Sequence, residues 1–98
     1  MNKDEFNVLL KQHIEKKYPS VPNSIDADVV SNLNLTVTQL AGLLQKYASN
    51  TISSEEKKLF IMLKDDLNRD IVDIPDSEDE FKQYYNEVVK LTELAENL

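Results

Sequence analysis

The fold is decided by residues 53–81, whose sequence is SSEEKKLFIMLKDDLNRDIVDIPDSEDEF. Apolar residues recur in its first half at the spacing of one helix face, which predicts a helix over about residues 54–72. The expected buried positions on this face are Leu59, Phe60, Leu63, Leu67 and Ile71. Ser53 followed by Glu56 has the spacing of a capping box, and Pro75 ends the segment because proline cannot continue a helix.

The chain beyond Pro75 repeats this pattern and predicts the last helix, over residues 77–97. Ser77 and Glu80 have the spacing of another capping box. The expected buried stripe is Phe81, Tyr84, Val88, Leu91, Ala95 and Leu98. Two long helices joined by so short a connection are expected to pack antiparallel.

The N-terminal half predicts two further long helices. The first covers residues 4–18 and ends before Pro19, because the residue that precedes a proline disfavours helical geometry. Its expected buried stripe is Phe6, Leu9, Leu10, His13, Ile14 and Tyr18. The other begins at a capping box formed by Thr36 and Gln39. Its expected inner face is Leu40, Leu43 or Leu44, Tyr47 and Ala48.

The segment before Thr36 has two interpretations. Residues 33–37 alternate apolar and polar side chains, as a strand does, but the chain offers no hairpin turn or second strand to pair with them. Ser24 or Asp26 can instead cap a short helix. The predicted fold is therefore all-α. We expect an antiparallel up-down helical bundle of four main helices plus this short one, in a single domain over residues 1–98.

The chain lacks most of the side chains that catalysis and metal binding use. It has no cysteine and one histidine, His13, which is expected to be a packed residue on an apolar helix face. Asp66, Asn68 and Asp70 match the first ligand positions of a calcium loop. The match fails at Ile71, where the loop needs glycine. We therefore expect no metal site, no cofactor and no enzymatic activity.

The sequence also gives no reason to expect membrane insertion. The longest uninterrupted apolar run covers residues 59–63, far short of the ~20 residues that a spanning helix needs. The first residues carry acids where a secretory signal needs positive charge. We expect a cytoplasmic protein.

Negative charge is concentrated in one part of the chain. The formal net charge is −7, and residues 1–50 are neutral, with five lysines and five acids. Between Asp65 and Glu80 there are eight acids against the single base Arg69. This balance argues against direct nucleic-acid binding, which needs lysine and arginine to displace counterions from phosphates.

The acidic stretch is the best candidate for a partner-binding site. The helix dipole favours acids at the start of the last helix, but it disfavours Asp70 and Asp73 at the end of the preceding one. Helix stability therefore explains only some of these acids, and the others suggest a binding surface. The alternative interpretation is that the cluster is a solvent-exposed corner of the bundle without a partner. A tyrosine at the edge of the buried stripe, beside carboxylates, suits a binding surface. The candidate partner-binding residues are Asp66, Asp70, Asp73, Asp76, Glu78, Asp79, Glu80 and Tyr85.

These features predict a small acidic, non-catalytic protein-binding module. Its expected role is that of an inhibitory or immunity-type protein that neutralises a partner with a basic surface. One alternative is a phage-type acidic inhibitor that mimics DNA by presenting carboxylates in place of phosphates. Another is a homodimerising structural or regulatory subunit, whose contacts would come from Ile61, Met62 and outer apolar residues of the last helix.

Part of the chain resembles a known family. Residues 40–46, LAGLLQK, and residues 52–63, ISSEEKKLFIML, resemble part of the enterocin-A-type bacteriocin immunity proteins. The resemblance implies a cytoplasmic helical bundle that protects a producing cell without catalysis, through a complex with a membrane receptor. The predicted helix over residues 77–97 and the acidity are departures from that family.

Overall fold

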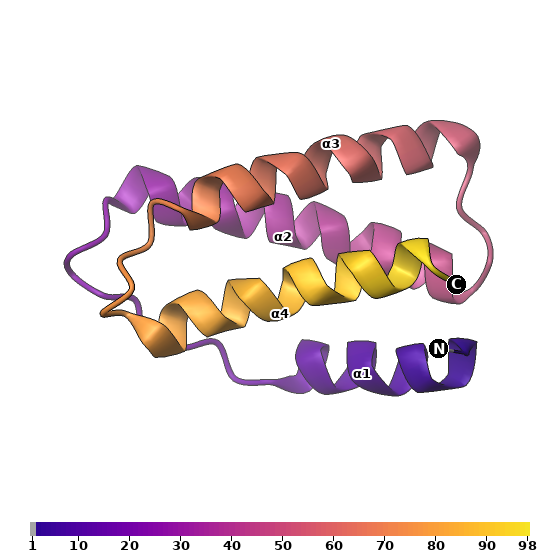
Figure 1. The fold of residues 1–98 in the computed structure, drawn as a ribbon, viewed down its shortest axis with the longest axis horizontal. Coiled ribbons are helices and arrows are strands. Elements are labelled where there is room, and N and C mark those ends of the chain that lie inside the picture. Colours follow the sequence, from indigo (N-terminus) through magenta and orange to yellow (C-terminus); the bar gives the residue numbers. More distant parts are fainter. Residues whose placement is uncertain (1) are drawn as a thin grey trace.

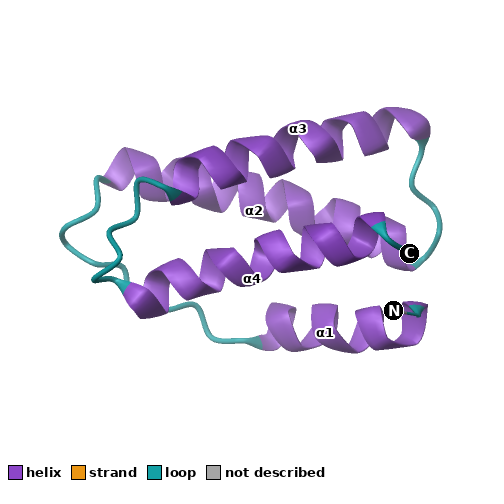
Figure 2. Ribbon diagram, in the orientation of Figure 1, coloured by secondary structure: helices purple, strands orange, loops and turns teal. Residues whose placement is uncertain are grey.

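Four α-helices run up and down along one long axis in a computed structural model that describes residues 2–98 (Figure 1). They are α1 (Lys3–Glu15), α2 (Ala27–Ala48), α3 (Ser54–Ile71) and α4 (Asp79–Glu96). Loops and turns join them, and the described residues contain no strand (Figure 2). The predicted all-α up-down bundle of four main helices is confirmed.

The helices do not all contact one another. α2, α3 and α4 form a unit in which every pair is in contact. α1 packs on α2 and α4, and within residues 2–98 it makes no contact with α3. The junction between α1 and α4 therefore lies at one side of the bundle (Figure 1).

One hydrophobic core joins the four helices. Its largest fully buried apolar side chains are Phe6, Leu33, Leu40, Leu44, Phe60, Leu67, Ile74, Phe81 and Val88. Each such side chain contributes about 1.5–3 kcal/mol when it leaves water, so this core is the main source of stability. Both alternatives on the inner face of α2 are realised, because Leu43 and Leu44 are each buried.

The predicted inner faces are correct at their centres and wrong at their margins. The core positions of α3 are confirmed at Phe60, Leu63, Leu67 and Ile71. Leu59, in contrast, is 41% exposed, because adjacent helical residues point about 100° apart and Phe60 holds the centre of the face. Ile14 on α1 and Leu98 after α4 are also exposed, contrary to prediction.

α2 is one continuous helix, so the separate short helix predicted before Thr36 does not exist. Asp26 caps α2, and its side chain accepts a hydrogen bond from the amide of Asp28 at 2.9 Å. The predicted capping box at Thr36 is wrong, since Thr36 is buried in the middle of the helix. The strand-like alternation is a helical face: Leu33 and Thr36 are buried at a spacing of three, while Leu35 is 60% exposed.

Two other predicted helix boundaries also need correction. α1 ends at Glu15, and Tyr18 lies in the following loop, where it still packs against the core. At the start of α4 the predicted capping box of Ser77 and Glu80 is absent: Glu78 is the N-cap and makes no side-chain capping hydrogen bond. The capping box at the start of α3 is present as predicted, with reciprocal hydrogen bonds between Ser53 and Glu56.

Candidate functional site

The predicted acidic stretch is carried by one end of the bundle. α3 ends there and α4 begins there, and up-down connectivity brings the start of α2 to the same end (Figure 1, left). The α1–α2 loop contacts the start of α4, since Ser24 Oγ donates a hydrogen bond to Glu78 Oε1 at 3.0 Å. We call this region the acidic end and define it by Asp26, Asp28, Asp66, Asp70, Asp73, Asp76, Glu78, Asp79 and Glu80.

The acidic end holds the whole charge excess of the protein. Its nine carboxylates are accompanied by two bases, Arg69 and Lys82, which leaves a formal charge of −7. The rest of the chain has nine acids and nine bases and is neutral. Asp26 and Asp28 were missing from the predicted site because they are remote in sequence, and only the bundle topology adds them.

Both bases at this end are already engaged. Arg69 Nη2 lies 3.0 Å from Asp66 Oδ1, and Arg69 Nε lies 3.7 Å from Asp70 Oδ1. Lys82 Nζ donates to Asp76 Oδ1 at 2.7 Å and to the carbonyl of Ile74 at 3.1 Å. The hydrogen bond and the positive charge of Lys82 hold the pKa of Asp76 below its usual value. These contacts fix three carboxylates in place.

Four carboxylates of the acidic end are exposed and form neither a hydrogen bond nor an ion pair within residues 2–98: Asp28, Asp73, Asp79 and Glu80. Asp28, Asp79 and Glu80 lie in first turns of helices, where the dipole stabilises negative charge by about 0.3–1 kcal/mol each. Asp70 and Asp73 lie at or just beyond the C-terminal turn of α3, where the same effect is unfavourable. The dipole of α3 therefore makes the charges of Asp70 and Asp73 unfavourable for folding.

Tyr85 does not belong to this surface, and its prediction as an edge residue is wrong. Its side chain is fully buried, and its hydroxyl donates to Asn34 Oδ1 at 2.7 Å and lies 2.7 Å from the hydroxyl of Tyr18. Burial, followed by the contact with Tyr18, raises the pKa of Tyr85 far above its usual value. The buried face of α4 passes through Phe81 and Tyr85, so Tyr84 takes the half-buried edge position instead.

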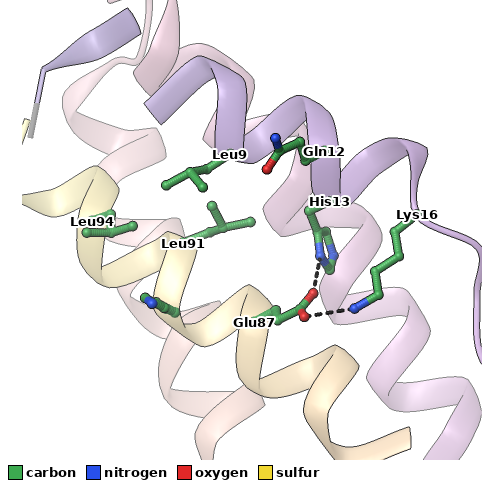
Figure 3. A pocket seen from close by; sticks show the side chains of 8 residues that line it. Leu9, Gln12, His13, Lys16, Glu87, Leu91 and Leu94 are labelled. Carbon is green, nitrogen blue, oxygen red and sulfur yellow. Dashed lines mark hydrogen bonds and ion pairs between the residues drawn. The ribbon is translucent and has the colours of Figure 1, made fainter. Parts of the chain in front are cut away.

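A second feature is a groove between α1 and α4 with a volume of about 350 Å³ (Figure 3). Its lining residues are Leu9, Gln12, His13, Lys16, Glu87, Lys90, Leu91 and Leu94. At one end of it the two oxygens of Glu87 lie 3.3 Å from His13 Nδ1 and 2.8 Å from Lys16 Nζ. Partial burial opposes ionisation of Glu87, but the hydrogen bonds from Lys16 and His13 outweigh it and lower the pKa of this carboxyl.

His13 leaves one polar atom unexplained in this groove. The imidazole is 11% exposed, and its ring lies 4.8 Å from that of Tyr84 between centroids. Because Glu87 is ionised, Nδ1 carries the hydrogen that is donated to it. The other nitrogen, Nε2, is buried and has no hydrogen-bond partner in the described part of the chain. A buried polar atom without a partner costs about 1–3 kcal/mol.

The described residues hold neither a metal-binding cluster nor a membrane-spanning helix. No group of three metal-ligating side chains comes together within residues 2–98. In the same range, none of the helices combines the length and the apolar character needed to traverse a bilayer.

The chain was also compared with known proteins. Protein-family models, curated proteins and solved structures all give no match. The relationship to the enterocin-A-type immunity proteins therefore stays a prediction from the sequence.

Proposed function

We propose that this protein is a non-catalytic protein-binding module that uses its acidic end to dock on a basic surface of a partner, as an inhibitor or immunity-type protein does. One observation carries the proposal. The whole net charge of −7 lies at one end of the bundle, on three helix termini, while the remainder of the chain is neutral.

The distribution suits electrostatic steering of a partner toward one orientation. A concentrated field of one sign raises association rates by about 10–10³-fold at low salt. The exposed carboxylates of Asp73, Asp79 and Glu80 are free to accept charge-assisted hydrogen bonds from arginine or lysine. Asp70 and Asp73 support the proposal further, because the dipole of α3 disfavours them and folding alone does not explain their presence.

The experiment uses two variants with equal loss of charge. The first carries Asp70→Asn, Asp73→Asn and Glu80→Gln, which spares the ion pair between Asp76 and Lys82. The control carries Glu15→Gln, Glu55→Gln and Glu93→Gln, three exposed positions outside the acidic end. Partners are captured from the native host with the unchanged protein, identified by mass spectrometry, and then purified for association kinetics.

The expected result is a difference between two variants of equal net charge. At low ionic strength the first variant should associate about 10-fold more slowly, whereas the control should stay within about 2-fold of the unchanged protein. At high salt the difference should shrink, because screening removes long-range attraction. Unchanged association of the first variant at low salt would contradict the proposal.

The chemistry of the partner distinguishes an immunity-type binder from a DNA mimic. A mimic occupies a groove that binds phosphates, so duplex DNA must compete with it for the partner. Competition by DNA would support the mimic, and its absence would support an inhibitor that binds elsewhere on the basic protein.

A homodimerising subunit is a second candidate, favoured by α3. Ile61 and Met62 are 50% and 56% exposed and lie outside the core face of that helix. Apolar association does not weaken with added salt, whereas acid-driven binding does. A dimer that persists at high salt in sedimentation experiments and is lost in an Ile61→Lys, Met62→Lys variant would support this candidate.

A further inference from the structure

The groove between α1 and α4 has an apolar part and a polar end. Leu9 from α1 and Leu91 and Leu94 from α4 lie together at one side of it (Figure 3). His13, Lys16 and Glu87 lie at the other side, joined by the two contacts of the Glu87 carboxylate (Figure 3). A lining of this kind suits a ligand with an apolar body and a polar head.

The charge of the lining differs in sign from that of the whole protein. Lys16 and Lys90 face a single acid, Glu87, so the lining carries a formal charge of +1 with His13 neutral. Glu87 engages Lys16, whereas Lys90 forms no ion pair within the described residues. The groove therefore offers a free cation to an incoming ligand and no free carboxylate, since both oxygens of Glu87 already accept hydrogen bonds.

We propose that this groove binds a small amphiphilic carboxylate, such as a medium-chain fatty acid. Its apolar chain lies against Leu9, Leu91 and Leu94, and its carboxylate pairs with Lys90, the free cation of the lining. The volume of about 350 Å³ limits the ligand to a small one, because ligand pockets range from about 300 to 1,000 Å³. The site shares no residue with the acidic end and does not depend on its function.

The test follows amide chemical shifts of the ¹⁵N-labelled protein during titration with octanoate, 1-octanol and octylamine, each kept below its aggregation limit. Octanoate should cause saturable shifts confined to residues 9–16 and 87–94, with a Kd of about 1 mM, as ligand efficiency gives for about ten heavy atoms. Octanol should bind at least about 3-fold more weakly, because it offers no negative charge to Lys90. Octylamine should bind more weakly again, because its ammonium group is repelled by Lys90.

A charge-removal pair tests the assigned cation. Lys90→Gln should weaken octanoate binding by about 3- to 5-fold, while Lys58→Gln should change it by less than about 1.5-fold. Lys58 is an exposed lysine on α3, the helix that α1 does not contact. Circular dichroism melts establish that both variants are folded.

Three results would overturn the proposal: no saturable shift at the groove residues with octanoate, equal or tighter binding of octanol or octylamine, or equal effects of the two lysine substitutions. The first two are measured on the unchanged protein, so they apply even if a variant fails to fold. Loss of protein-partner binding at the acidic end would leave all three measurements unaffected.

Discussion

The two ends of the bundle use charge in opposite ways. At the end where α2 finishes and α3 begins, which we call the paired end, Glu56 completes the capping box and forms an ion pair with Lys46. Glu96, the last residue of α4, is paired at 2.6 Å with Lys64 from the second half of α3. At the acidic end, α4 begins without a side-chain cap, and Asp70 and Asp73 stand against the dipole of α3.

Backbone hydrogen bonds also close the helix at the paired end. The α2–α3 connection turns at Asn50, which has φ 58°, a left-handed conformation that asparagine tolerates better than most residues. The amide of Thr51 then bonds the carbonyl of Lys46 at 2.9 Å and closes the end of α2. Because Glu56 caps α3 and pairs with Lys46, charge at the paired end contributes to helix stability, whereas much of the charge at the acidic end needs another explanation.

The largest expected effect comes from the hydrogen bonds that lie beneath the surface of α4. Tyr85→Phe should lower the free energy of unfolding by about 1–3 kcal/mol, because Asn34 and Tyr18 both lose a partner. Tyr18→Phe is the matched control and should cost less, since Tyr85 keeps its bond to Asn34. Urea denaturation measures both. A loss at Tyr18 as large as that at Tyr85 would contradict this account of the network.

Capping at the two ends gives the next comparison. Ser53→Ala removes a cap that accepts the Glu56 amide at 3.1 Å, and it should cost about 1 kcal/mol. Ser77→Ala, one residue before the N-cap of α4, should change stability by less than about 0.5 kcal/mol because no capping bond is lost there. Both values come from chemical denaturation. Equal costs would mean that the two ends are capped alike in solution.

Within the acidic end, two pairs of substitutions are expected to change the free energy of unfolding in opposite directions. Asp70→Asn with Asp73→Asn should raise stability by about 0.5–1 kcal/mol, whereas Asp79→Asn with Glu80→Gln should lower it by a similar amount. Both effects should shrink when the salt concentration rises from about 0.01 M to about 1 M, because the screening length then falls from about 30 Å to about 3 Å. Denaturation at the two salt concentrations provides the measurement. A loss of stability in the first pair would remove the argument that folding disfavours these acids.

The fold was predictable because most of its signals are local. Periodicity located the inner faces of all four helices, since each face repeats within one helix. The capping-box pattern was less reliable: it occurs at Ser53, Thr36 and Ser77, and only Ser53 forms a box. Thr36 is buried within α2, and Ser77 lies in the turn after Pro75, so tertiary placement decided both cases.

The candidate site was predictable only where it is contiguous. The acids after Asp65 were located because they follow one another in the chain, whereas Asp26 required knowledge of which helix ends meet. Tyr85 was misplaced because two adjacent tyrosines fit the stripe almost equally, and the contact with Asn34 that selects one of them is long-range. The contact between Glu87 and His13 across the groove also joins residues far apart in the chain, so no local sequence pattern predicts it.

The smallest expected effect concerns pH and lies outside the acidic end. Lys16 and His13 lower the pKa of Glu87 below its ordinary value of 4.5, so the unfolded chain binds this proton more tightly than the folded one. The stability gained is therefore present above that value and is lost as the pH falls through the lowered pKa of the folded state. Glu87→Gln should reduce stability at pH 7 by less than about 1 kcal/mol, because the pair is partly solvated.

The same substitution should also flatten the decline in stability between about pH 5 and pH 3, whereas Glu93→Gln, an exposed control on the same helix, should not. Denaturant midpoints measured across this range give the slope. If the acid decline of Glu87→Gln follows that of the unchanged protein, the contacts of Glu87 with Lys16 and His13 do not persist in solution. The groove would then present a free carboxylate at its polar end, and the charge argument for an anionic ligand would fail together with the pH prediction.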